Sequence, residues 1–244
     1  MLIQFLGSGD AFGSGGRFNT CFHVTVADGS FLIDCGASSL IAMRKFGVDP
    51  NGIRTVFVSH LHGDHFGGLP FLLLDAQFYS RRSVPLTLVG PPGFRVRLTQ
   101  AMELFFPGSS TAERRFSTDI VEINAGRTTV INGVTVTAYE VEHACGAPPF
   151  ALRLETDGKV LVYTGDTEWT ENLIAAGRDA DLLIAEALVF ERRIKFHLDY
   201  ASLKANLARI GAKRVILTHM GPDMLAHIGE ASEELAEDGK TVVV

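Results

Sequence analysis

Four side chains of the kinds that bind metal ions lie within six consecutive positions of this sequence. Three imidazoles and one carboxylate occur in Ser59-His60-Leu61-His62-Gly63-Asp64-His65, directly after the apolar run TVFVS (55–59). In a helix, His60 and Asp64 would share one face and His62 would point elsewhere, whereas a tight loop eased by neighbouring glycines allows all of them to point inward. The segment therefore predicts a buried strand that ends in a ligand-rich loop.

Further candidate ligands recur at the ends of later apolar runs. His143 follows TAYEVE, Asp166 follows LVYTG, and His219 follows RVILT. Taken singly, each has an ordinary alternative: a strand-end histidine is often only hydrogen-bonded, an aspartate often caps a turn, and loop histidines are often solvated. Their recurrence favours a shared metal site. Imidazole and carboxylate ligands without thiolates suit an open site, with zinc expected first and manganese second.

Composition limits the classes of protein to consider. The 244 residues are 46% hydrophobic, enough for a substantial core, and no linker divides them, so we expect a single domain over residues 1–244. The formal charge is −6 with no basic run, which disfavours extended nucleic-acid contact.

Three widely spaced cysteines without a CxxC pair argue against a disulfide framework. Neither a membrane span nor a signal peptide is recognisable, so we expect an unprocessed cytoplasmic protein without a membrane partner.

Short apolar runs and helical patterns alternate along the chain. Turn signals at Asp28-Gly29, Asn132-Gly133 and Asp157-Gly158 each predict a hairpin. Other strands are expected at 2–7, 55–59, 181–187 and 214–219, with one of the hairpin strands placed at 31–35. Helices are expected at 38–46, 68–79, 93–105, 170–176 and 200–210, the last capped by Asp199. Because hairpins and crossovers are mixed, this α/β pattern favours sheets with helices on their outer faces.

The ordered motifs His60-Leu61-His62-Gly63-Asp64-His65, His143, Thr164-Gly165-Asp166-Thr167 and Leu217-Thr218-His219 resemble those of the metallo-β-lactamase superfamily over essentially the whole chain. The resemblance implies a four-layer αββα sandwich with two metal ions at one edge. It also implies that His60, His62 and His143 bind one ion, that Asp64, His65 and His219 bind the other, and that Asp166 bridges them.

The opening segment from Gln4 to Gly13 and the histidine of Phe196-His197-Leu198-Asp199-Tyr200 resemble the ribonuclease Z and cyclic phosphodiesterase branch of that superfamily. In that branch such a histidine donates a proton or hydrogen bond near the scissile phosphate. The alternative for His197 is a partly exposed histidine at a helix entry. The glycines of the opening segment would turn backbone N–H groups toward an anionic oxygen.

The chain departs from the tRNA-trimming enzymes of this branch, because a single hairpin replaces their long arm between His143 and Asp166. We therefore expect a small or single-stranded phosphodiester as substrate and consider tRNA unlikely. The expected nucleophile is metal-bound hydroxide, with Asp64 accepting a proton and His197 protonating the leaving group. Thioester or lactam hydrolysis, a ribonuclease Z-type endonuclease and a non-catalytic metal- or RNA-binding protein are the alternatives. The apolar segment 69–79 is expected in the core or at a homodimer face.

Overall fold

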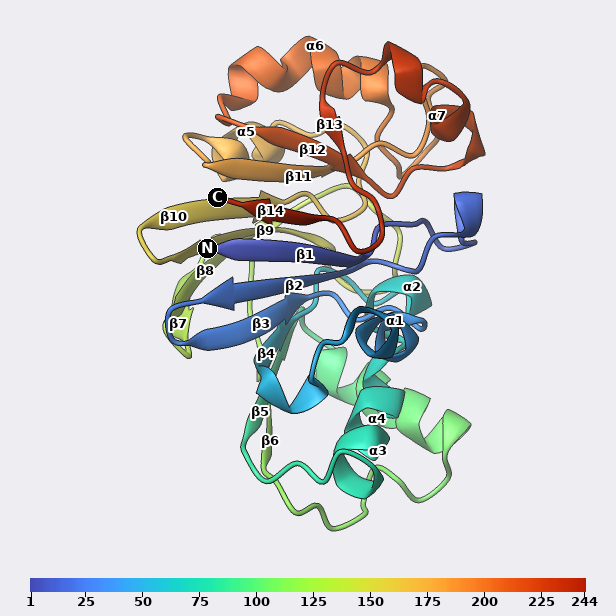
Figure 1. Ribbon diagram of the computed structural model, residues 1–244. Coiled ribbons are helices and arrows are strands. Elements are labelled where there is room, and N and C mark those ends of the chain that lie inside the picture. The colour runs from blue at the N-terminus through green and yellow to red at the C-terminus, as the bar shows by residue number, and fades with distance from the viewer.

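Two sheets of seven strands lie face to face in the computed structural model, which describes residues 1–244, and helices cover both outer faces (Figure 1). The first sheet contains, in spatial order, β14 (Thr241–Val243), β1 (Leu2–Gly7), β2 (Cys21–Val26), β3 (Gly29–Ile33), β4 (Ile53–Phe57), β5 (Leu86–Gly90) and β6 (Thr118–Glu122). The second contains β13 (Glu234–Leu235), β12 (Val215–Thr218), β11 (Leu182–Glu186), β10 (Lys159–Tyr163), β9 (Phe150–Thr156), β8 (Val134–Glu140) and β7 (Thr128–Ile131).

The helices form two outer layers. Against the first sheet lie α1 (Ser39–Phe46), α3 (Leu69–Phe78) and α4 (Phe94–Phe105), and against the second lie α5 (Asn172–Gly177), α6 (Tyr200–Ile210) and α7 (Pro222–Ala226). Short helical turns occur at α2 (Gly63–Phe66), η1 (Ser14–Gly16), η2 (Pro50–Gly52) and η3 (Ile228–Glu230). The expected αββα sandwich is therefore confirmed. None of the helices combines the length and apolar character that a membrane span requires.

Three apolar clusters hold these layers together. The largest comprises 23 buried residues between the two sheets, where Phe22 packs edge-on against both Phe5 and Tyr163. The second cluster joins the first sheet to α1, α3 and α4, and the third joins the second sheet to α5 and α6. Strands that are covered on both faces need continuous apolar runs, which explains the sequences of β5 and β11, whose residues are all buried.

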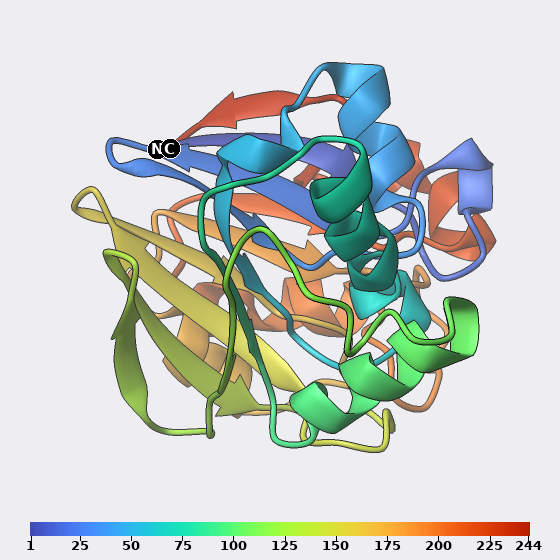
Figure 2. The same ribbon diagram turned by 90° about the horizontal axis from the view of Figure 1, so that it is seen from below.

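The direction of the strands determines where the site can lie. In the first sheet β3, β4, β5 and β6 run parallel, and in the second β10, β11, β12 and β13 run parallel, while the remaining neighbours pair antiparallel. The carboxyl ends of these strands meet at one edge of the sandwich. The chain termini lie at the opposite end from the η1 loop, as Figures 1 and 2 both show.

Most expected elements occur within a few residues of their predicted bounds. One boundary was wrong in an informative way: the strand expected at 31–35 ends at Ile33, because Asp34 adopts a left-handed backbone with φ of 57°. Helix α6 begins as predicted, with the Asp199 carboxylate accepting a hydrogen bond from the Ser202 N–H at 2.7 Å. In α3 the residues that face the core are buried, whereas Phe78 is 69% exposed.

Candidate metal centre

The seven residues expected to bind metal all lie at the carboxyl-end edge of the sandwich. The segment after β4 carries His60 and leads into the α2 turn, at which His62 is the N-cap residue. His143, Asp166 and His219 follow β8, β10 and β12 of the second sheet. The site is therefore built from both sheets, and the expected loop after β4 includes one helical turn.

The ligand atoms form two neighbouring sets. His60, His62 and His143 form one, and Asp64, His65, Asp166 and His219 form the other; within each set the ligand atoms lie within 4.8 Å of one another. In the first set, Nδ1 of His62 and Nε2 of His143 are 3.0 Å apart. In the second, Nε2 of His65 lies 3.2 Å from Oδ2 of Asp64.

Asp166 lies between the two sets. Its Oδ2 atom is 3.3 Å from Nε2 of His219 and 3.9 Å from Nε2 of His60, and its Oδ1 atom is 3.4 Å from Nε2 of His65. The carboxylate is 2% exposed, so its contacts are almost entirely with protein atoms. This is the position that a carboxylate shared between two ions requires.

Several buried atoms of the site make no hydrogen bond within the protein. These are Nε2 of His60, Nε2 of His65 and Oδ1 of Asp166. Buried polar atoms are normally paired, and an isolated buried carboxylate is strongly unfavourable without a cation. The three unpaired atoms all belong to the two sets, so the donor chemistry and the burial fit divalent ions.

The charges within the site explain which imidazoles are neutral. Burial lowers the pKa of His60, His143 and His219, which keeps these rings in the neutral form that binds metal. His65 differs: burial alone would lower its pKa, but Asp166, Asp64 and Asp34 together raise it well above the ordinary value. Burial and the neighbouring Asp166 would raise the pKa of Asp64, but its contact with His65 lowers that pKa to about 2. The buried carboxylates around His65 therefore stabilise a positive charge at this edge of the sandwich.

A second layer of polar groups orients the candidate ligands. The Asp34 carboxylate accepts hydrogen bonds from the Ser59 N–H at 2.7 Å and the Ser59 hydroxyl at 2.8 Å, and its Oδ2 lies 2.7 Å from Nδ1 of His65. Nδ1 of His143 donates to the carbonyl of Phe196 at 2.7 Å. Such contacts fix the tautomer and orientation of a metal-binding ring.

His197 lies beside the second set, with its Nδ1 atom 2.5 Å from Oε1 of Glu186 and 3.9 Å from Oδ2 of Asp166. Glu186 is fully buried at the end of β11 and also accepts hydrogen bonds from the N–H groups of Thr167 and Leu198. Burial raises the pKa of Glu186 to about 8, and the contact with Glu186 raises the pKa of His197 against the effect of burial. The pair therefore retains a proton at neutral pH.

Asp34 and Glu186 were not singled out from the sequence. Both are acidic residues at the end of a continuous apolar run, FLID (31–34) and LLIAE (182–186), and both are fully buried. A carboxylate in such a position is seldom buried unless it is paired. That signal was present in the sequence and marks both residues as parts of the site.

Close backbone approach explains two glycines around the ligand loop. A Cβ atom on Gly36 would lie 2.1 Å from the carbonyl oxygen of Asp64, and one on Gly68 would lie 2.3 Å from the carbonyl oxygen of Gly36. Larger side chains at these positions would push the α2 turn away from the end of β3. Strain is also present at His219, which has a φ of 57° where non-glycine residues are uncommon.

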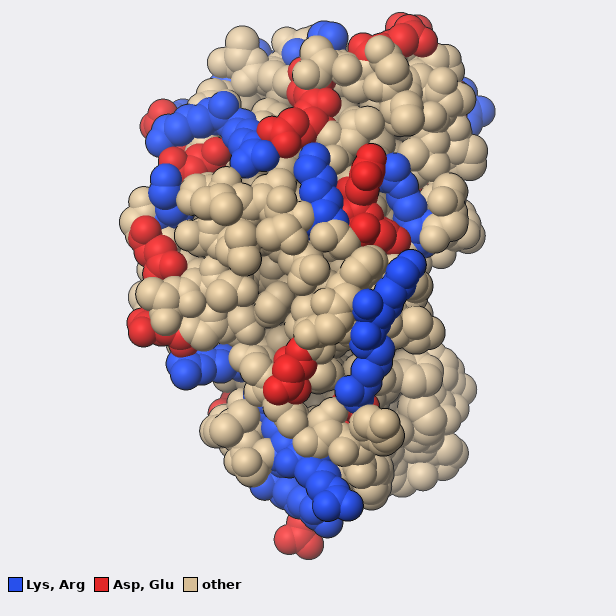
Figure 3. Space-filling model, viewed as in Figure 1, with Lys and Arg blue, Asp and Glu red and all other residues tan.

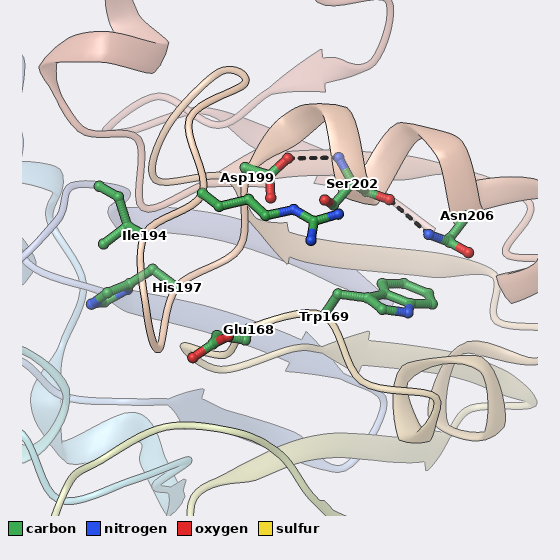
Figure 4. A pocket seen from close by; sticks show the side chains of 8 residues that line it. Glu168, Trp169, Ile194, His197, Asp199, Ser202 and Asn206 are labelled. Atoms are coloured by element: carbon green, nitrogen blue, oxygen red, sulfur yellow. Dashed lines mark hydrogen bonds between the residues drawn. The ribbon is translucent and has the colours of Figure 1, made fainter.

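A cavity of about 210 Å³ opens over the metal-binding edge; its lining residues are Asp10, Ala11, Phe12, His62, Asp64, Asp166, Leu188, His197 and His219. A separate cavity of about 210 Å³ lies beyond the 191–197 loop and includes Trp169 and Asn206 (Figure 4). In that view the imidazole of His197 points away from Trp169 and Asn206. His197 lines both cavities and lies between them.

Several backbone N–H groups of the glycine-rich opening segment donate within the protein, at Ser8, Gly9, Phe12 and Gly13. That its amides bind an anionic oxygen remains a prediction. The Ser8 hydroxyl donates to Asp238, and the Arg17 guanidinium donates to the carbonyl of Ala236. The segment lines the cavity with Asp10, Ala11 and Phe12.

The three cysteines do not contribute ligands. Cys21 and Cys35 are buried in the core, and the Cys145 thiol donates to the carbonyl of Ala147 at 3.0 Å. His227 lies outside the site and stacks on Phe190, with ring centroids 4.6 Å apart.

The sequence is similar to those of proteins named ribonuclease Z. Ribonuclease Z of Mycobacterium bovis is 29% identical over 252 residues, which cover 95% of this chain and 89% of that protein. Ribonuclease Z of Geobacillus kaustophilus is 27% identical, covering 87% of this chain and 84% of that protein.

Solved structures share the fold. The short form of human tRNase Z superposes with a TM-score of 0.80 at 24% identity, covering 100% of this chain and 99% of that chain. The metallo-β-lactamase fold protein YhfI from Bacillus subtilis gives 0.78 at 21% identity, covering 99% and 98%. A diphosphatase of the PhnP family gives 0.79 at 16% identity, covering 100% and 97%.

The sequence also matches the family described as Anti-Pycsar protein Apyc1 over residues 1–242, which is nearly its whole length. The match, the relatives and the site together assign the chain to the ribonuclease Z branch of the metallo-β-lactamase superfamily. The chain is a metal-dependent hydrolase that belongs to the Anti-Pycsar protein Apyc1 family.

Proposed function

We propose that this protein is a dinuclear phosphodiesterase that hydrolyses a small or single-stranded phosphodiester. The observation that carries the proposal is the placement of Asp166 between two ligand sets, beside the Glu186–His197 pair. The first set, His60, His62 and His143, would hold one divalent ion, and Asp64, His65 and His219 would hold the other. Zinc suits these ligands best, with manganese second.

Two divalent ions held there would supply a water nucleophile of lowered pKa and would neutralise charge on the phosphoryl oxygens. The protein's own residues handle the protons. Asp64, with 11% of its side chain exposed, borders the cavity and is the acceptor for the proton of the attacking water. Its low pKa keeps the carboxylate ionised, the form that binds a metal ion.

His197 protonates the leaving alkoxide in this proposal. Its imidazole is 24% exposed and lines the cavity over the ligand sets, so a substrate can reach it. The contact with Glu186 raises the pKa of His197 and so favours the protonated ring that a general acid requires. A thioester hydrolase has less use for such an acid, because a thiolate departs more readily than an alkoxide.

The connection between His143 and Asp166 supports a small substrate. It consists of β9 and β10 joined through Asp157-Gly158, so no arm extends from this part of the fold. The surface agrees with this: on the face drawn in Figure 3, basic side chains stand in separate groups with acidic groups between them. We therefore propose that pre-tRNA is a poor substrate and that residues 1–244 act as one hydrolase unit.

The experiment that tests this function compares three substrates of zinc- or manganese-reconstituted protein, with metal content measured in the same samples. Bis-p-nitrophenyl phosphate, a lactoylglutathione-type thioester and a chromogenic cephalosporin represent the three reaction classes. We expect about two ions per chain and turnover of the phosphodiester. Turnover of only the thioester or only the cephalosporin would refute the phosphodiesterase assignment, and faster cleavage of pre-tRNA than of small diesters would refute the proposed size preference.

A further inference from the structure

Phe12 is the most exposed large apolar side chain of the protein. It lies in the loop between β1 and β2 with 94% of its surface accessible. Transfer of a phenylalanine side chain from water into a packed environment is favourable, so leaving it exposed forgoes stabilisation. A single exposed apolar residue is ordinary by itself. Phe12 differs from an ordinary exposed residue in two respects: it borders the cavity over the ligand sets, and hydrogen bonds fix the loop that carries it.

The loop that carries Phe12 is held by hydrogen bonds on the inner side. The Asp10 carboxylate, in a residue only 3% exposed, accepts from the Phe12 N–H at 3.2 Å, from the Ser14 N–H at 2.8 Å and from the Ser14 hydroxyl at 2.6 Å. Asn19 donates through Nδ2 to the Asp10 carbonyl at 3.2 Å. At the base of the loop the Gly9 N–H donates to the Phe18 carbonyl at 2.8 Å. The ring is thus presented on an ordered scaffold.

The same loop reaches the metal-binding edge. The carbonyl of Ser8 accepts a hydrogen bond from the N–H of His219 at 3.1 Å, and the hydroxyl of Thr20 lies 3.3 Å from Nδ1 of that histidine. Phe12, Ala11 and Leu188 supply apolar wall to the cavity whose other side is formed by Asp64, Asp166 and His197. An aromatic ring and the proposed reaction centre therefore border one cavity of about 210 Å³.

We propose that Phe12 is a specificity-determining residue of this site and stacks on the nucleobase of a nucleotide substrate. This inference rests on the proposed phosphodiesterase function and assigns one residue to substrate recognition. The phosphodiester lies against the imidazole and carboxylate side of the cavity, and the base lies against the ring of Phe12. The side chain of Phe12 has no hydrogen-bonding atom, so it recognises the planar face common to all bases, and selectivity among the bases is expected to be weak.

A binding measurement tests the proposal without depending on turnover. Calorimetric titration of the zinc-reconstituted protein with adenosine 5′-monophosphate and with ribose 5-phosphate compares two ligands that share a phosphorylated ribose and differ in the base. We expect the wild-type protein to prefer the nucleotide. In Phe12→Ala this preference should fall about 5- to 150-fold, the loss expected when one base–aromatic stack is removed. Phe12→Trp should retain it.

Phe78→Ala provides the matched control. Phe78 is also a highly exposed phenylalanine, at 69%, but it lies at the end of α3 and does not line the cavity. We expect this variant to retain the nucleotide preference. Equal binding of the two ligands by the wild-type protein, absence of binding by both, or an unchanged preference in Phe12→Ala would overturn the proposal. A wild-type dimer that Phe12→Ala converts to a monomer in light scattering would instead assign the ring to an interface between two copies.

A kinetic measurement separates this proposal from the function on which it rests. Adenosine 2′,3′-cyclic phosphate and glycerol 1,2-cyclic phosphate present the same five-membered cyclic diester with and without a base. The ratio of their kcat/KM values should fall about 5- to 150-fold in Phe12→Ala, mainly through KM for the nucleotide. If the wild-type protein cleaves both and the ratio does not change, the phosphodiesterase function stands and the role of Phe12 fails. If the wild-type protein cleaves neither diester but its preference for the nucleotide in binding depends on Phe12, the role of Phe12 stands and the phosphodiesterase function fails.

Discussion

A buried carboxylate orients the imidazole that we propose as the general acid: Oε1 of Glu186 lies 2.5 Å from Nδ1 of His197. Glu186 is itself fixed by the N–H groups of Thr167 and Leu198. The arrangement leaves the second nitrogen of the His197 ring available to the substrate and raises the pKa of the ring. Orientation and proton affinity therefore come from a single contact.

Glu186→Gln should shift the pH dependence of kcat. A general acid is effective below its pKa and is lost as pH rises through that value, so the raised pKa of His197 extends activity toward alkaline pH. Glutamine keeps the shape of the side chain but removes the charge, so the alkaline limb should move to lower pH. Glu140→Gln, at the exposed end of β8, is the control. An alkaline limb in the same position would contradict the positioning role.

His197→Ala should retain the metal and lose turnover by about 10² to 10⁴-fold, the usual contribution of a general acid. Metal analysis and the kcat for adenosine 2′,3′-cyclic phosphate, whose leaving group is an alkoxide, are measured on the same samples. His227→Ala removes a histidine that stacks on Phe190 outside the site, and it should leave both quantities unchanged. Near-normal turnover of the His197 variant would exclude its role as the acid.

Asp166→Ala should lose at least one metal ion, because this carboxylate contacts histidines of both ligand sets. The number of ions per chain after reconstitution is the quantity to measure, with Asp119→Ala on the exposed side of β6 as the matched control. Two full equivalents in the Asp166 variant would rule out a bridging carboxylate.

Asp34→Ala should weaken metal binding about 10- to 100-fold although Asp34 is not itself a proposed ligand, because outer contacts of this kind orient the ligating ring. The substitution also leaves the buried Ser59 N–H without its acceptor, which costs about 1–3 kcal/mol of folding stability. Asp34→Asn keeps an acceptor for that N–H and should recover much of the stability but less of the metal affinity. Unchanged affinity in both variants would contradict the orienting role.

The sequence predicted which seven side chains lie together at this edge, because the determinants of their placement are local. The cluster between His60 and His65 and the ligands after later strands each follow an apolar run, and the carboxyl ends of such strands meet at one edge. The hairpins and five of the helices were predicted for the same reason, since turn residues and periodicity act over a few positions. The expected roles of the individual ligands remain predictions for the experiments above.

Elements that depend on distant contacts were missed. Strand β5 (Leu86–Gly90) is only five residues long, and β13 (Glu234–Leu235) pairs through two residues beside β12. Neither has a pattern long enough to show a period. The roles of Asp34 and Glu186 depend on partners 31 and 11 positions away, and the exposure of Phe12 depends on how its loop folds over the sheet edge. Sequence periodicity carries no information on such pairings.

The division of the ligands between the two sheets has a thermodynamic consequence. The segment after β4 brings four of them from one sheet, whereas His143, Asp166 and His219 come from the other. Ions bound at this edge would connect the two sheets. Metal affinity and the free energy of packing between the sheets would therefore be thermodynamically linked, so that a change in one changes the other. Substitutions in the inter-sheet core, for example at Phe22 or Tyr163, would then weaken metal binding from a distance, and chelation would loosen the packing of aromatic residues that touch no ligand.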